Sequence, residues 1–407
     1  MSGNPAAATS TTRSRPLLLT PDFGRLAITA MAFFFSMGAT FPVLPRFVKD
    51  DLGGTDTTVG LVIGATALGA VVARPAIGFI GDRRGRRLLM ILGGVVAAAA
   101  HLALVVVGDV ATLMVLRVIF GVGQGAFFVG ATTLAVDLAD VDRRGEATSY
   151  IFVALHFGSG LGPLVGEWAL GRWDFDATWY IAAAGCAVAA LAAITVPNVV
   201  GSDLDLEQPR MRLVHPRAVL PGVVLGIGII GFVGFNAFVP LYGEEIGVDN
   251  IAPLFLISSF TIVAIRFFGA RLPDRLGPVR GGTAALVGMA AGMSLIGFVD
   301  SAGGLYAGTV VMSCGTALLL PSLVSAAVDG VPANERSTAL ATYTLFMEFS
   351  LAIGAVIFGA VAGASSYGAA FVLAAVMALI ALALLWARMP RHLGQGDSTA
   401  REPATAG

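Results

Sequence analysis

Four ionisable side chains stand inside long apolar segments of this sequence and are the residues most able to do chemistry: Arg117, His156, Glu167 and Glu348. A charged group in hydrocarbon is costly, so a residue of this kind is functional by default. Glutamate and histidine can take up and release a proton, whereas arginine keeps its charge. These residue types therefore point to proton transfer and ion binding inside a membrane.

Glu348 and His156 occupy matching positions in two similar segments, since 348 − 156 = 192. Each lies about nine residues into its apolar segment, which is about 13 Å deep at the rise of a helix and near the middle of a ~30 Å hydrocarbon core. A lone histidine is often a hydrogen-bonded packing residue, but a glutamate in this position rarely is. We therefore predict that Glu348 carries protons, with His156 or Arg117 as its partner when the cavity closes.

The same offset of 192 residues recurs along the chain and indicates an internal duplication. The matched pairs are Arg74 with Arg266, Asp82 with Asp274, Gly85 with Gly277, Asp137 with Asp329, and Arg144 with Arg336. The charges at the segment ends are interpreted as ion pairs that close one side of the molecule, not as substrate ligands.

The elements that position these residues must be membrane helices. Of the 407 residues 56% are hydrophobic and 13% are charged, with a mean hydropathy of +0.84, whereas a soluble domain carries about a quarter charged residues. The apolar segments lie near 26–48, 57–80, 88–107, 111–136, 147–170, 178–196, 218–241, 251–272, 281–299, 303–328, 338–362 and 367–387. Each is long enough to span a bilayer as a helix.

We predict an all-α membrane protein with twelve transmembrane helices in two pseudo-symmetric six-helix bundles, at residues 22–200 and 217–390. A cytoplasmic linker at 201–216 joins them, and disordered tails occupy 1–21 and 391–407. Arginines fall in every second loop. Because positively charged loops stay on the cytoplasmic side, we predict that the protein lies in the inner membrane with both termini in the cytoplasm. We expect a monomer in the lipid bilayer. The two cysteines, Cys186 and Cys314, lie in apolar segments and are interpreted as packing residues.

A basic stretch between the second and third apolar segments carries a family signature. Its residues are Gly78, Asp82, Arg83, Gly85, Arg86 and Arg87. They resemble the loop G-x-x-x-D-R-x-G-R-R/K of the major facilitator superfamily. We expect the ten residues 78–87 to form a tight turn in solvent. The resemblance implies that this loop and Asp137 gate the inner side, with Asp274 and Arg275 as a degraded second copy.

Two further motifs resemble motifs of that superfamily, and the first is similar to that of its twelve-helix drug:proton antiporters. Gly158-x-x-x-Gly162-Pro163-x-x-Gly166 resembles the antiporter motif of the fifth helix and is associated with export. Gly162 and Pro163 are predicted to let this helix bend and slide against the eighth predicted helix, near residues 251–272. Glu167 replaces the final glycine of the motif, and it either couples protons or simply reaches water near Arg172.

Arg117 begins the second of these motifs, Arg117-x-x-x-Gly121-x-Gly123. The resemblance links it to proton coupling. The structural alternative is an arginine satisfied by neighbouring carbonyl groups.

The predicted function is secondary transport of a small molecule by alternating access, driven by a proton gradient with no cofactor. The predicted substrate contacts are Phe34, Phe120, Gln124, Phe128, Asn236, Tyr343 and Phe346. The sequence has no phosphate-binding glycine loop with a lysine, no metal-ligand spacing and no nucleophile arrangement, so we expect neither an enzyme nor an ATP-driven pump, and no nucleic-acid partner. We favour efflux of an amphipathic drug, natural product or metallophore. The alternative is transport of a polar metabolite, sugar or organic anion with Arg117 as a direct ligand.

Overall fold

The computed structural model describes residues 20–140, 143–200, 214–248, 250–269, 272–331 and 335–399. Most of the predicted linker at 201–216 and of the N-terminal tail lies outside these residues. The described chain is helical and contains no strand, which confirms the all-α prediction.

Six long helices form the first half, and short helical turns join some of them. They are α1 (Pro21–Ala39), α2 (Val43–Arg46), η2 (Phe47–Asp51), α3 (Asp56–Arg84), α4 (Arg86–Ala103), η3 (Leu104–Val106), α5 (Val110–Asp137), α6 (Arg144–Arg172) and α7 (Phe175–Ala193).

The second half also has six helices. They are α8 (Pro216–Glu245), α9 (Ala252–Phe268), α10 (Leu272–Phe298), α11 (Ala302–Val328), α12 (Arg336–Ala364) and α13 (Tyr367–Thr399). Across the described residues, eleven helical segments are long and apolar enough to span a bilayer, and α9 is a shorter apolar helix. The helix α13 continues past Arg391 to Thr399, where the sequence predicted a tail. This stretch contains no proline, and its two glycines, Gly394 and Gly396, weaken a helix without excluding it.

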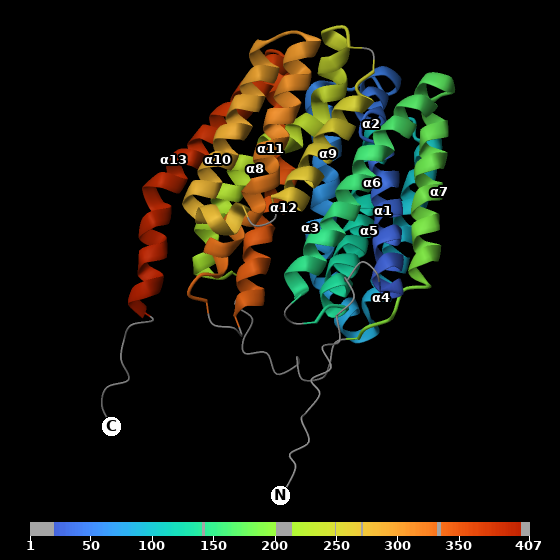
Figure 1. The fold of residues 1–407 in the computed structure, drawn as a ribbon. Coiled ribbons are helices and arrows are strands. Elements are labelled where there is room, and N and C mark those ends of the chain that lie inside the picture. Colours follow the sequence, from blue (N-terminus) through green and yellow to red (C-terminus); the bar gives the residue numbers. More distant parts are fainter. Residues whose placement is uncertain are drawn as a thin grey trace, which may run out of the picture.

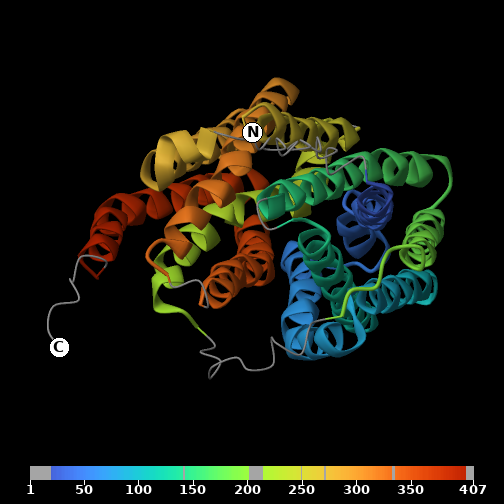
Figure 2. The ribbon, with the colours of Figure 1, turned by 60° about the horizontal axis from the view of Figure 1, so that its bottom comes forward.

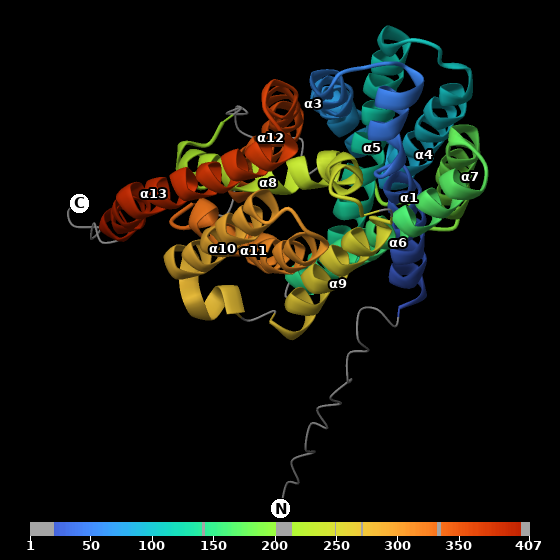
Figure 3. The same cartoon turned by 90° about the horizontal axis from the view of Figure 1, so that it is seen from above.

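The two halves stand side by side and meet along two seams (Figures 1 and 3). In one seam α3 of the first half packs against α12 of the second, and in the other α6 packs against α9. Because these helices correspond under the 192-residue offset, the two seams are related by the internal pseudo-symmetry.

The buried apolar side chains of the described residues form a shared core, two larger cores that each belong to one half, and a small cluster of Ile77, Leu89 and Ala126 in the first half. The shared core lies at the end of the molecule that contains Arg46, and it combines Phe47 and Trp179 of the first half with Phe238 and Tyr242 of the second. The other two cores each belong to one half. The halves are therefore joined at the Arg46 end and packed independently toward the opposite end, which contains Gly85 and faces the viewer more directly in Figure 2.

The basic stretch at the Gly85 end is mostly helical, so the prediction of a ten-residue turn is wrong. The helix α3 continues to Arg84 and α4 begins at Arg86, which leaves Gly85 as the turn, with φ of 95°. A glycine tolerates this left-handed value, and a Cβ atom there would overlap the side chain of Asn198. Gly277 has φ of 70° at the matching position inside α10, so both copies keep the same turn.

Candidate functional site

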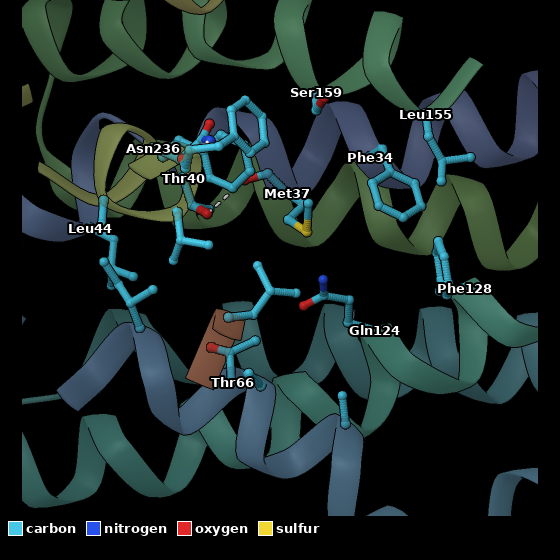
Figure 4. Close-up of a pocket in the computed structure, with 18 of the residues that line it drawn as sticks. Phe34, Met37, Thr40, Leu44, Thr66, Gln124, Phe128, Leu155, Ser159 and Asn236 are labelled. Carbon is cyan, nitrogen blue, oxygen red and sulfur yellow. Dashed lines mark hydrogen bonds between the residues drawn. The ribbon is translucent and has the colours of Figure 1, made fainter. Parts of the chain in front are cut away.

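A cavity of about 360 Å³ lies between the two halves. Its walls come from α1, α3, α5 and α6 on one side and from α8, α9 and α12 on the other. Five of the predicted substrate contacts line it: Phe34, Phe120, Gln124, Phe128 and Asn236. Figure 4 labels all of these except Phe120. The lining is mostly apolar with scattered polar groups, as in sites for drug-sized organic molecules.

Two predicted substrate contacts, Tyr343 and Phe346, lie away from this cavity. The Tyr343 hydroxyl donates to the carbonyl of Leu320 at 2.8 Å inside the core of the second half, and Phe346 packs on Gly222. The face of α12 that meets the cavity carries Met347, Glu348 and Leu351 instead. The sequence could not tell these faces apart because apolar side chains surround α12 on every side.

Several cavity residues were not predicted from the sequence. They are small polar or flexible side chains, namely Met37, Thr40, Thr66, Ser159, Ser258 and Ser259. Ser258 and Ser259 had a recognisable signal, since two adjacent hydroxyl groups interrupt an otherwise apolar segment. Serine and threonine in membrane helices often bond to backbone carbonyls, however, so this signal alone does not define a site.

Glu348 lines the cavity and forms an ion pair with Arg74 across the α3–α12 seam. The side chains keep 15% and 29% of their exposure, and Oε2 of Glu348 has no hydrogen-bond partner among the described residues. The sequence had suggested Arg117 or His156 as the partner of Glu348. Arg74 takes that place because α3 and α12 pack directly together, with Gly60 and Gly64 close against Ala355 and Ala352.

His156 occupies the matching position on α6 and lines the same cavity. Its Nδ1 donates to the carbonyl of Phe152 at 2.8 Å. Arg266, the counterpart of Arg74, lies with its guanidinium 5.4 Å from the centre of the Phe152 ring, and its Nε is buried without a partner among the described residues. This seam therefore has a cation–π contact where the other has an ion pair.

Arg117 lines the cavity from α5 and is buried, with 7% of its surface exposed. Its guanidinium lies 4.8 Å from the centre of the Phe120 ring. Nε and Nη1 are buried and have no hydrogen-bond partner in the described part of the chain. These contacts do not support the structural alternative, in which neighbouring carbonyl groups accept hydrogen bonds from Arg117.

Glu167 lies outside the cavity, at the Arg46 end. Arg46 donates to both of its carboxylate oxygens, at 2.9 and 2.8 Å, and also forms an ion pair with Glu244 of α8. Glu167 is therefore paired, but with Arg46 rather than Arg172. Because Glu244 belongs to the second half, this cluster links the two halves.

The charged residues at the Gly85 end form a cluster within the first half. Arg86 donates to Asp82 at 2.7 Å and to Asp137 at 3.4 Å, and Arg83 covers the ring of Phe79 at 4.2 Å. In the second copy Arg275 is exposed, and the side chain of Asp274 lies outside the described residues. The predicted ion-pair cluster is present at the first copy.

The small-residue motif of α6 packs mainly within its own half. Gly158, Gly162 and Gly166 approach the backbone of α1, and Gly160 meets Ser259 of α9 across the seam. Pro163 is buried inside α6. The helix α6 does pack against α9, the eighth spanning helix along the chain, but the three motif glycines face α1 because alternate positions of a helix face different neighbours. Bending and sliding at Gly162 and Pro163 stay a prediction.

The family profile for the Major Facilitator Superfamily matches residues 26–282 and 251–406. An uncharacterized MFS-type transporter of Salmonella typhimurium is 26% identical over 90% of this chain and 96% of its own length. Among solved structures, the human organic anion transporter MFSD10 superposes with a TM-score of 0.69 at 19% identity, covering 89% of this chain and 98% of that one.

A POT family transporter in complex with a thioalcohol-conjugated peptide superposes with a TM-score of 0.76 at 14% identity, covering 91% of this chain and 96% of that one. The chain belongs to the major facilitator superfamily and is a multi-pass membrane transporter of that type.

Proposed function

We propose that this protein is a proton-coupled exporter of a small amphipathic organic compound. The observation that carries the proposal is Glu348, a carboxyl that lines the apolar cavity and bridges the two halves through Arg74. A carboxyl at such a place can hold the halves together when ionised and release them when protonated. That dependence is what couples a proton to a conformational change.

Export is supported by the glycine–proline motif of α6, which resembles the motif associated with exporters, whereas the charges and cores indicate only to which side the cavity opens. Arginine-rich loops mark the Gly85 end as cytoplasmic, with both termini on that side of the inner membrane. Among the described residues the shared core lies at the Arg46 end, so this conformation favours access to the cavity from the cytoplasm, a state through which importers and exporters both pass. The protein works as a monomer in this proposal, with one half rocking against the other.

The experiment starts from a ligand found by thermal shift, across drugs, sugars, amino acids and siderophore-like compounds, since a true ligand raises the apparent Tm. Wild type and Glu348→Gln are then reconstituted in liposomes with a pH-sensitive dye inside. Wild type should move protons opposite to the substrate, whereas Glu348→Gln should exchange labelled substrate without moving protons. Glu245→Gln, an exposed acid outside the cavity, is the matched control.

A Glu348→Gln protein that moves protons as wild type does would remove Glu348 from coupling. Loss of folded Glu348→Gln protein would indicate a structural role for the ion pair instead.

The second candidate is transport of an organic anion, and one observation favours it. Arg117 faces the cavity without a partner of opposite charge among the described residues. MFSD10 is named an organic anion transporter, but at 19% identity that likeness concerns the fold, so the argument rests on Arg117 itself.

A further inference from the structure

The charged side chains around the cavity do not balance. Among the lysine, arginine, aspartate and glutamate side chains of the described residues, two line the cavity: Arg117 and Glu348. Glu348 is already neutralised by Arg74 across the seam. The cavity is therefore left with the uncompensated positive charge of Arg117.

The two charged groups also lie at different depths, so they do not form an ion pair with each other. Arg117 is about two helical turns from the start of α5 at the Arg46 end, whereas Glu348 is more than four turns from the corresponding end of α12. In keeping with this separation, no ion pair between them is formed.

An unpaired arginine in this position is costly. Burying a charge without a hydrogen-bonding partner is unfavourable by several kcal/mol in general, and buried guanidinium groups normally bind carboxylates or carbonyls. The contact with the Phe120 ring at 4.8 Å offsets only part of that cost, because a cation–π contact satisfies none of the N–H donors. A ligand whose acidic group reached this guanidinium would supply a charge-assisted partner and lower that cost.

We propose that the substrate of this carrier is an amphipathic organic anion whose carboxylate or other acidic group binds Arg117 while its apolar part fills the cavity. The inference rests on the transport function proposed above and names the substrate class. Gln124 lies two turns along the same face of α5 and lines the cavity with its amide, so it can bind a second polar group of the same molecule (Figure 4). The remaining wall, which includes Phe34 and Phe128, is apolar.

The test uses two molecules of the same shape that differ in charge, 1-naphthylacetate and 1-naphthylacetamide. Their binding to purified full-length protein in lipid nanodiscs is measured by equilibrium dialysis, with empty nanodiscs as the blank. Wild type should bind the carboxylate at least about tenfold more tightly than the amide, because a charge-assisted hydrogen bond to a buried arginine is that strong.

Three variants locate the preference. Arg117→Gln should bind both molecules equally, whereas Arg117→Lys should keep a preference for the carboxylate. Arg266→Gln is the matched control, since Arg266 is also buried over a phenylalanine ring with an unpartnered Nε but does not line this cavity. Its preference should equal that of wild type.

Wild type that binds neither probe, or the amide as tightly as the carboxylate, overturns the proposal. A preference that persists in Arg117→Gln overturns it too, provided that this variant elutes as a folded monomer. If it does not fold, Arg117→Lys decides, because the compact ammonium cannot reproduce the hydrogen bonds of the guanidinium, and a preference as large as that of wild type overturns the proposal. The measurement involves no proton movement and no direction of transport. A failure here is therefore distinct from a failure of the coupling experiment with Glu348→Gln.

Discussion

The two seams between the halves carry the same arginine but give it different partners. In the α3–α12 seam Arg74 pairs with Glu348, whereas in the α6–α9 seam Arg266 lies over Phe152 beside His156. The arginines match under the 192-residue offset, and so do Glu348 and His156. The duplication thus preserved the position of the arginine in each seam. The residue at the position of Glu348 or His156 decides whether that arginine has an ion pair.

This difference makes the seams unequal as conformational devices. An ion pair across a seam resists separation unless its carboxyl is protonated, whereas a cation–π contact holds no titratable acid. We infer that protonation of the carboxyl weakens the α3–α12 seam, and that the α6–α9 seam serves as the hinge between the halves. Three substitutions test this inequality, and a fourth tests the charged cluster at the Gly85 end.

The largest expected effect comes from Arg74→Met. It leaves Glu348 partly buried and unpaired, which should lower the free energy of unfolding by about 3 kcal/mol, at the low end of the range for buried pairs because Arg74 keeps 29% exposure. The thermal midpoint of purified protein, followed by tryptophan fluorescence, measures the loss. The double variant with Glu348→Gln should recover most of it, and a double variant no more stable than Arg74→Met would disprove the pairing.

His156→Glu should make the two seams alike. A carboxylate at this position can pair with Arg266, whose charge is already buried, so the gain in stability should be about 1.5 kcal/mol. Transport should slow, because a second ion pair must now break in each cycle. His156→Gln is the control with similar size and no charge. A lower thermal midpoint for His156→Glu than for His156→Gln would contradict this expectation.

Arg266→Met is the counterpart of Arg74→Met and should have a much smaller effect. It removes a cation–π contact worth about 1 kcal/mol but leaves no acid unpaired, and it also removes a buried charge. The same thermal measurement on both methionine variants compares the seams directly. Equal losses for Arg74→Met and Arg266→Met would show that the seams are energetically equivalent.

Asp82→Asn should change stability least and still reduce transport. Asp82 keeps 61% of its side-chain exposure and pairs with Arg86 one turn away, so the loss should be below about 1 kcal/mol. Transport should fall because this cluster lies at the Gly85 end, where the halves must meet when the carrier changes state. Expression and transport are measured together, and normal transport by Asp82→Asn would exclude the cluster from the gate.

Much of the architecture was predictable because membrane helices obey strong local rules. Long apolar segments must become helices, since hydrocarbon leaves backbone groups no other partners. The offset of 192 residues located the matched arginines and glycines, and Gly85 and Gly277 do share a left-handed turn. The ten-residue turn was wrong because a helix can continue beyond the bilayer as far as Arg84 and end at a single glycine.

The sequence by itself determined which residues are unusual: Arg117, His156 and Glu348 as ionisable groups in apolar segments, and the repeat that relates two of them. Only the tertiary structure decided their partners. Glu348 meets Arg74 and Glu167 meets Arg46 because helices distant in sequence pack together, and Tyr343 turns into the core rather than the cavity. In a membrane helix every face is apolar, so the hydrophobic pattern that orients soluble helices carries little information, and side-chain packing between helices sets the orientation instead.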